Sequence, residues 1–300
     1  MAKAANQSTK RHIAAVLGEL DSDATHLRQL TESLLADAHP EDLAAIDPVI
    51  LAAGMTKTAK ALADHKKGGS VVRVESIADT SWCVASVINE NMPFLFDSVL
   101  GEINDASHNT GFVVHPILEV KHTKDTFEIV DKSRPGLARE ETIRTSVIHV
   151  LIPDLDDDAT STLEAGLAEV IKRVKDAVRD WRAMLTRLDE VIEELRTGVL
   201  PIKKADANEA LAFLEWLRDD NFTFLGIREY DYRGGATRGQ LVRADLSPLG
   251  ILSDPQLRVM RRGDEPVTTT PQIRAFLNSR SQGPSSSPHE GSRQAFCHAR

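Results

Sequence analysis

The sequence predicts an α+β protein, and three observations support this. Residues 82–120 alternate in hydrophobicity, change to helical spacing and then alternate again. Residues 127–130 and 146–152 add two strand-like segments. From Thr160 to Arg196 the apolar residues recur every seven positions, as they do in a long packed helix. We therefore expect a βαββα arrangement that is preceded by helices.

Composition limits the classes of function. The chain has 300 residues, of which 41% are hydrophobic, enough to bury more than one core. Its net charge of −9 argues against binding to nucleic acid or to an anionic membrane surface. No apolar run is long enough to cross a bilayer and the N-terminus lacks a secretory signal, so we expect a cytoplasmic protein. Cys83 and Cys297 have no metal-ligand spacing and predict neither a disulfide nor a structural zinc.

Residues 1–67 are predicted to form an N-terminal helical segment. Pro40 and Pro48 punctuate it, and the run 66–69 (Lys-Lys-Gly-Gly) ends it before a short strand at 71–74. The apolar residues at helical spacing are Ile13, Val16, Leu17, Leu20, Leu27, Leu30, Leu34 and Leu35. We place the first domain boundary here.

The central unit is predicted to be strand, helix and strand. The strand from Trp82 is apolar on both faces, so it is expected to be buried on both sides. Asn91 suits the N-cap of the following helix, and Asp97 places negative charge in its first turn. Leu95, Val99, Ile103 and Ala106 form its apolar face. Residues 112–121 alternate as a second strand.

Residues 68–200 are predicted to be one domain that includes the long helix. Its heptad positions are Leu163, Val170, Ala177, Met184 and Val191, and Leu167, Val174, Trp181, Leu188 and Leu195. We favour packing of this seam within the monomer over an intermolecular coiled coil, which would make a homo-oligomer.

Residues 201–277 are predicted to begin a second α/β module. A helix around Phe213 precedes a strand at 222–232, and Gly234-Gly235 is a hairpin turn. A β-rich segment at 248–252 and a short helix at 271–277 are also expected. Residues 278–300 contain little to bury and are expected to be disordered.

Four segments resemble the N-terminal region of the large bacterial NAD-specific glutamate dehydrogenases. They are Asn91–Leu100, Phe112–Pro116, Asp180–Met184 and Glu215–Tyr230, and the resemblance runs from about Val71 to Leu277. It implies ACT-like regulatory modules of ferredoxin type, which agrees with the βαββα order. It also implies that the catalytic residues and the NAD-binding domain lie downstream as partners of this region. NAD is then the cofactor of the full-length family, and this chain alone is expected to be non-catalytic.

A search for chemistry in the residues predicts no catalytic, cofactor-binding or metal site. The sequence lacks GxGxxG after a strand, GxxxxGK[ST], HExxH and GxSxG. His115, Glu119 and His122 could suggest a metal site, but a polar strand face is favoured because metal sites need more donors. Asp219 and Asp220 are expected to be a solvated helix end.

The candidate binding site is the turn after the first central strand. In ACT-like modules this turn binds amino acids, so the resemblance implies an amino-acid effector at Asn89, Glu90, Asn91 and Asp97. Free amides at a helix N-terminus suit a carboxylate, and Glu90 or Asp97 could bind an ammonium group. The alternative is that Asn91 is a plain cap and Asp97 only complements the helix dipole. A free-standing amino-acid sensor or a stand-alone interaction module are the other functions considered.

The resemblance stops at about 278–282, and Ser-Ser-Ser-Pro stands at 285–288. Codons for an apolar Leu-Ile-Val-Thr strand, read one base later, encode Ser-Ser-Ser-Pro. We therefore expect either a frameshift that truncated the protein or a disordered linker.

Overall fold

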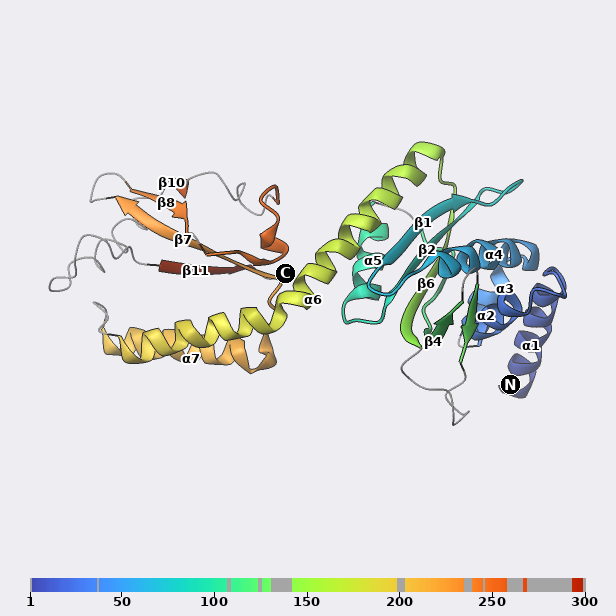
Figure 1. The fold of residues 1–300 in the computed structure, drawn as a ribbon. Coiled ribbons are helices and arrows are strands. Elements are labelled where there is room, and N and C mark those ends of the chain that lie inside the picture. Colours follow the sequence, from blue (N-terminus) through green and yellow to red (C-terminus); the bar gives the residue numbers. More distant parts are fainter. Residues whose placement is uncertain are drawn as a thin grey trace. The chain divides into compact units, whose positions relative to one another are not determined.

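The computed structural model describes residues 2–36, 38–106, 109–123, 126–130, 142–198, 203–234, 239–244, 246–257, 267–268 and 293–298 (Figure 1). The chain divides into two compact units, residues 1–172 and 173–300. This division differs from the expected boundaries after 67 and 200. It places the N-terminal helical segment together with the sheet, and it falls inside the long helix.

The described part of residues 1–64 is mainly helical, as the sequence predicts for this segment. Its helices are α1 (Ala2–Gly18), α2 (Thr25–Leu35), α3 (Pro40–Ala45) and α4 (Pro48–Asp64). Pro40 and Pro48 each stand at the start of a helix, where the missing N–H costs no hydrogen bond. The Asp47 side chain caps α4 by accepting from the Val49 amide at 2.8 Å.

The sheet of the first unit has the order β1-β2-β6-β4-β5, and β3 also pairs with β6. Its strands are β1 (Ser70–Ser76), β2 (Trp82–Glu90), β3 (Phe112–Val114), β4 (Ile117–His122), β5 (Phe127–Ile129) and β6 (Ile143–Pro153). β2, β3 and β4 all run antiparallel to β6, so they run parallel to one another. β2 pairs with one edge of β6, and β3 and β4 pair with the other edge. This is the split βαβ of ferredoxin-like folds, so the α+β prediction is confirmed.

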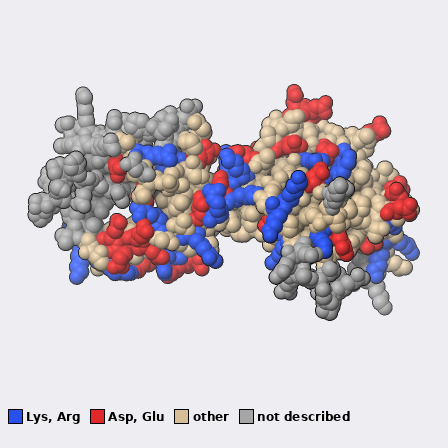
Figure 2. All heavy atoms as spheres, in the orientation of Figure 1, with Lys and Arg blue, Asp and Glu red and all other residues tan. Residues whose placement is uncertain are grey.

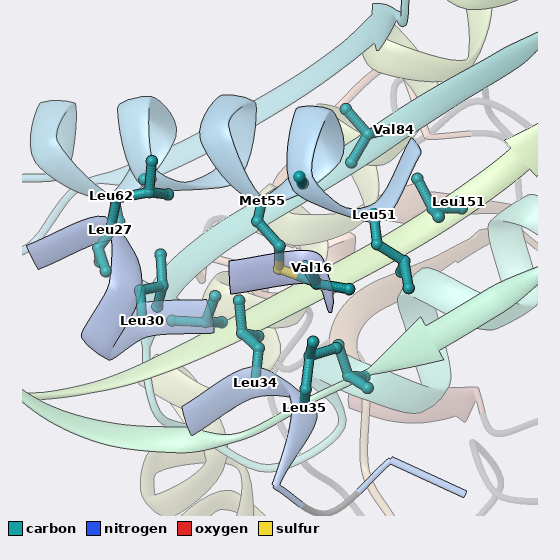
Figure 3. Close-up of a cluster of buried hydrophobic side chains, with 14 of the residues drawn as sticks. Val16, Leu27, Leu30, Leu34, Leu35, Leu51, Met55, Leu62, Val84 and Leu151 are labelled. Atoms are coloured by element: carbon teal, nitrogen blue, oxygen red, sulfur yellow. The ribbon is translucent and has the colours of Figure 1, made fainter. Parts of the chain in front are cut away.

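One face of this sheet packs on the N-terminal helices. Val84 and Leu151 lie in the same buried cluster as Leu30, Leu51 and Met55 (Figure 3). The helices supply the apolar surface that this face of the sheet must bury. The N-terminal segment is therefore part of the domain core.

The opposite face carries α5 (Leu95–Asp105) and the first part of α6 (Asp157–Thr197) (Figure 1). Leu95, Val99 and Ile103 of α5 are buried, as predicted. Cys83 of β2 is a buried free thiol whose sulfur lies 3.8 Å from the Thr160 hydroxyl of α6. Both faces of β2 are thus covered, as its apolar residues on both faces predict.

A polar group also lies inside this core, between α4 and the sheet. Thr58 of α4 hydrogen-bonds Ser86 of β2 at 2.8 Å and the His149 Nδ1 of β6 at 2.7 Å. All three side chains are fully buried, and His149 Nε2 has no hydrogen-bond partner in the described part of the chain. Burial lowers the pKa of His149 to about 3.

Two local predictions in this unit are wrong. Helix α5 begins at Leu95, after Phe94 in the left-handed conformation (φ 69°), so Asn91 is not its N-cap. The single strand expected at 112–121 is interrupted at His115-Pro116. Proline has no N–H to donate to the ladder, which accounts for the break.

Helix α6 spans 41 residues and confirms the predicted long helix. Six heptad residues are buried: Leu163, Leu167, Val174, Ala177, Met184 and Leu188. Trp181 was expected in the same seam but is 44% exposed, whereas Ile171 and Ile192 are buried. A straight α-helix repeats every 3.6 residues and drifts away from a seven-residue pattern, which explains the difference.

The second unit contains α7 (Lys204–Trp216), a π-turn (Leu217–Asn221) and a sheet of order β10-β8-β7-β11, with β9 beside β7. The strands are β7 (Gly226–Gly234), β8 (Gly239–Arg243), β9 (Leu249–Gly250), β10 (Val267–Thr268) and β11 (Arg293–His298), and a 3-10 turn spans Ile251–Ser253. β7 pairs antiparallel with β8, as the expected hairpin requires, and Gly235 of the predicted turn lies outside the described residues. The strand expected from Phe222 begins at Gly226.

Strand β11 lies within the tail that was expected to be disordered. It pairs antiparallel with β7, whose edge offers unpaired backbone groups to another strand. The rest of the tail, including 285–288, and the helix expected at 271–277 lie outside the described residues.

Within the described ranges, no helix is both long enough and apolar enough to span a membrane.

Candidate functional site

The predicted site residues lie where β2 ends and α5 begins, and their contacts differ. Asn89 and Glu90 are adjacent in β2, so their side chains leave opposite faces of the sheet. The Glu90 carboxylate accepts from the Gly68 amide at 2.6 Å and holds the turn before β1. The Asn91 amide donates to the Arg144 carbonyl at 2.8 Å and extends the β2–β6 ladder. These contacts tie the end of β2 to the turn before β1 and to β6.

Asn89 is buried, with 1% of its surface exposed. It lies opposite Ser146 of β6 in the antiparallel register. Its amide nitrogen donates to the Glu90 carbonyl at 2.6 Å, while its Oδ1 has no hydrogen-bond partner among the described residues. A buried polar atom without a partner costs stability, and such an atom often marks a site of function or a bound water.

His115 connects this strand end to α5. Its Nε2 lies 2.6 Å from the Ser146 hydroxyl, and its ring stacks on Phe96 of α5 with the ring centres 4.7 Å apart. Burial lowers the pKa of His115, and the negative charge of Asp97 partly opposes this effect. The net effect favours the neutral imidazole. We call Asn89, Phe96, Asp97, His115 and Ser146 the β2–α5 cluster.

The N-terminus of α5 has no side-chain cap. Phe94 occupies the N-cap position, and Asp97 is the acidic residue of the first turn. The first amides of a helix have no partner within the helix and favour negative charge. The cluster thus combines hydrogen-bond donors for a carboxylate with acceptors, at Asp97 and Asn89, for an ammonium group.

The other sequence candidates are separated by the fold. Glu119 accepts a hydrogen bond from Thr142 at 3.4 Å, and the His122 ring lies beside His65, with the ring centres 5.4 Å apart. Within the described part of the chain, no group of three or more His, Cys, Asp or Glu residues could hold a metal ion. Asp219 and Asp220 are exposed at the π-turn after α7.

Sequence reasoning missed Phe96, His115 and Ser146 as members of this cluster. Their proximity depends on the pairing of β6 with both β2 and β4, which no local pattern reveals. The His115-Pro116 pair was the one available signal, since a proline often interrupts a strand next to a site where a side chain changes direction.

The motif residues of the second unit hold α6, α7 and the sheet together. Asp180 accepts from the Gly250 amide at 2.8 Å, and Arg196 pairs with Glu215 at 2.7 Å. Arg218 pairs with Asp189. Acidic and basic side chains lie intermixed over α6 and α7 on the face shown in Figure 2. These motif residues have structural roles.

Comparison with known proteins agrees with the fold. Residues 30–167 match the family described as glutamate dehydrogenase, ACT1 domain. The chain is 33% identical over 203 residues to the NAD-specific glutamate dehydrogenase of Halomonas elongata, a match that covers 65% of this chain and 12% of the relative. It is 27% identical over 183 residues to the Pseudomonas aeruginosa enzyme of the same name, covering 59% and 11%.

Residues 30–167 thus combine a ferredoxin-like sheet topology with similarity to the glutamate dehydrogenase ACT1 domain. The resemblance is confirmed: the chain is related to the N-terminal region of the NAD-specific glutamate dehydrogenases. The matched part spans about an eighth of the length of these relatives.

Proposed function

We propose that this chain is the N-terminal regulatory part of a cytoplasmic NAD-specific glutamate dehydrogenase. The complete enzyme would convert L-glutamate, NAD and water to 2-oxoglutarate, ammonium and NADH. NAD and the catalytic residues would belong to dehydrogenase domains downstream, which are the partners of this region. The observation that carries this proposal is the match of residues 30–167 to the glutamate dehydrogenase ACT1 domain.

The β2–α5 cluster is the proposed site of an amino-acid effector. The effector carboxylate would bind the uncapped amides of α5, and its ammonium group would bind Asp97. Asn89 Oδ1, which is buried without a described partner, is a second acceptor for the ammonium group if the strand end opens. The capping explanation of Asn91 does not apply, because α5 starts four residues later, at Leu95. Asp97 still complements the helix dipole, so a ligand would compete with that role.

Titration calorimetry tests this proposal on the purified chain with glutamate, aspartate and branched-chain amino acids. We expect one of them to bind, and we expect Asp97→Asn to weaken binding about tenfold through loss of one charge-assisted contact. Asp105→Asn, at the other end of α5, is the matched control and should bind as the wild type does. The effector proposal fails if no amino acid binds or if both variants behave alike.

A separate assay tests the proposal that catalysis belongs to the downstream domains. The chain is incubated with L-glutamate and NAD, and NADH is followed at its absorbance maximum. We expect no turnover. Sustained NADH formation would contradict the proposal that this part is regulatory only.

Self-association through α6 is the competing interaction role. Leu167 is fully buried, so much of the heptad seam is already used inside the chain. We therefore expect light scattering to give a mass that does not depend on concentration. A mass that rises with concentration and falls after Trp181→Ala would favour the interaction role, since Trp181 is the exposed heptad residue.

A further inference from the structure

A cavity lies within the second unit, and no binding role was predicted from the sequence for the residues that line it. It has a volume of about 230 Å³ and is lined by Arg187 and Glu190 of α6, Ile227 and Glu229 of β7, and Leu246 and Leu249 of the segment after β8. Sites for drug-sized ligands are usually about 300–1,000 Å³, so this cavity suits a smaller molecule.

Arg187 is held in this cavity by a buried partner. Its guanidinium forms a two-pronged ion pair with Glu229, one arm of which measures 2.8 Å. The Glu229 side chain is only 6% exposed and that of Arg187 is 20% exposed. A bidentate pair of this kind fixes the plane of the guanidinium, and removal of either partner would leave a buried charge.

Arg187 has a second partner that is solvent-exposed. Its Nη1 donates to Glu190, whose side chain is 51% exposed. Exposed ion pairs contribute about 0–1 kcal/mol, so this contact can open at little cost. Arg187 thus offers one donor that is fixed in direction by Glu229 and is available to a competing carboxylate.

Apart from Ser247, which is exposed, the rest of the lining is aliphatic. Ile227 is 3% exposed and Leu249 is half-buried, so they form a fixed apolar wall. Leu246 is 41% exposed. Covering it would remove apolar surface from water, a gain proportional to the area covered.

We propose that this cavity binds a free α-amino acid with an aliphatic side chain. The ligand carboxylate takes the place of Glu190 on Arg187 Nη1, and its ammonium group pairs with the released Glu190 carboxylate. Because the ligand carries one positive and one negative charge, its binding leaves the net charge of the cavity unchanged. The aliphatic side chain lies against Ile227, Leu246 and Leu249. This site is in the second unit and is independent of the proposed β2–α5 effector site.

Titration calorimetry with L-leucine and two analogues tests the proposal on the full chain. The analogue 4-methylpentanoate lacks the ammonium group, and 3-methylbutylamine lacks the carboxylate. We expect leucine to bind and each analogue to bind at least about tenfold more weakly, because each loses one charged contact. Equal affinity for leucine and 4-methylpentanoate would refute the role of Glu190.

Point variants then test whether leucine binds in this cavity. Glu190→Gln should weaken leucine binding about tenfold, and Glu194→Gln, an exposed change one turn further along α6, should have no effect. Leu246→Ser should also weaken binding, and as a surface change it should leave the fold intact. Asp97→Asn should leave leucine binding unchanged. Loss of binding in Asp97→Asn with retention in Glu190→Gln would place leucine at the β2–α5 cluster and overturn this inference alone. If leucine does not bind at all, the inference about this cavity is also overturned. That result would say nothing about whether other amino acids bind the β2–α5 cluster.

Discussion

Acid should destabilise the first unit through His149. This imidazole is fully buried, and its pKa falls from 6.5 to about 3 in the folded chain. The folded state therefore keeps His149 neutral, whereas the unfolded state binds a proton below pH 6.5. Stability from this group is complete above pH 6.5 and is lost as the pH falls toward 3. The loss is about 1.4 kcal/mol per pH unit, or about 2 kcal/mol between pH 6.5 and pH 5.

The assay follows unfolding of the first unit alone. The chain has three tryptophans, and Trp181→Phe with Trp216→Phe leaves Trp82 of β2 as the reporter. Urea unfolding is recorded by fluorescence at pH 7.5, 6.5 and 5. In this background we compare His149→Gln, whose amide can still accept from Thr58 but cannot titrate, with the parent.

We expect His149→Gln to be less stable at pH 7.5 but to lose about 2 kcal/mol less than its parent between pH 6.5 and pH 5. Burial also lowers the pKa of His115 and His122, so part of the pH dependence should remain. His39→Gln removes an exposed histidine as a control. If His149→Gln and its parent lose the same stability on acidification, the reasoning about His149 is refuted.

Three further substitutions test the packing. Gly111→Ala should destabilise the fold by about 1–3 kcal/mol, because the new Cβ would lie 2.3 Å from the Trp82 ring. Gly101→Ala should be neutral or stabilising, because no atom lies within 4 Å of the new Cβ; equal urea midpoints for the two variants would contradict this reasoning. Leu30→Ala should cost about 2–5 kcal/mol through a cavity between the helices and the sheet; a loss in urea unfolding below 1 kcal/mol would mean that this core collapses around the gap. Glu229→Gln should lower the thermal midpoint by an amount equivalent to about 2 kcal/mol, and Glu190→Gln should barely move it; the opposite order would mean that the exposed pair is the stronger one.

Much of the fold could be predicted because its determinants are local. The alternation from Trp82 to Glu90 predicts a strand covered on both faces, and the structure has it. Pro40 and Pro48, which were expected to punctuate the N-terminal helical segment, each begin a helix. The start of α5 could not be predicted, because Phe94 adopts a left-handed conformation that its sequence does not favour. Asn91 does not cap α5; its backbone amide donates to the Arg144 carbonyl instead.

Only part of the β2–α5 cluster could be predicted from the sequence, because some of its members come together only in the tertiary fold. Asn89 and Asp97 are close in the sequence, and capping rules draw attention to that turn. Ser146 lies more than fifty residues away and reaches Asn89 only through the register of β6. In the second unit, Arg187 and Glu229 come from a helix and a strand, and their pairing has no local signature either. Contacts of this type are set by the tertiary fold, whereas helix caps and strand alternation are set locally.

The position of β6 between β2 and β4 has a consequence for synthesis of the chain. β6 ends at Pro153, so β2 and β4 have no strand between them until that residue has left the ribosome. Until then the N-terminal helices can cover β1 and β2, but the inner edge of β2 remains open. Edge strands that wait for a distant partner fold slowly and are prone to associate with other chains. Nascent chains that stop before residue 143 should therefore be the ones that most need a chaperone.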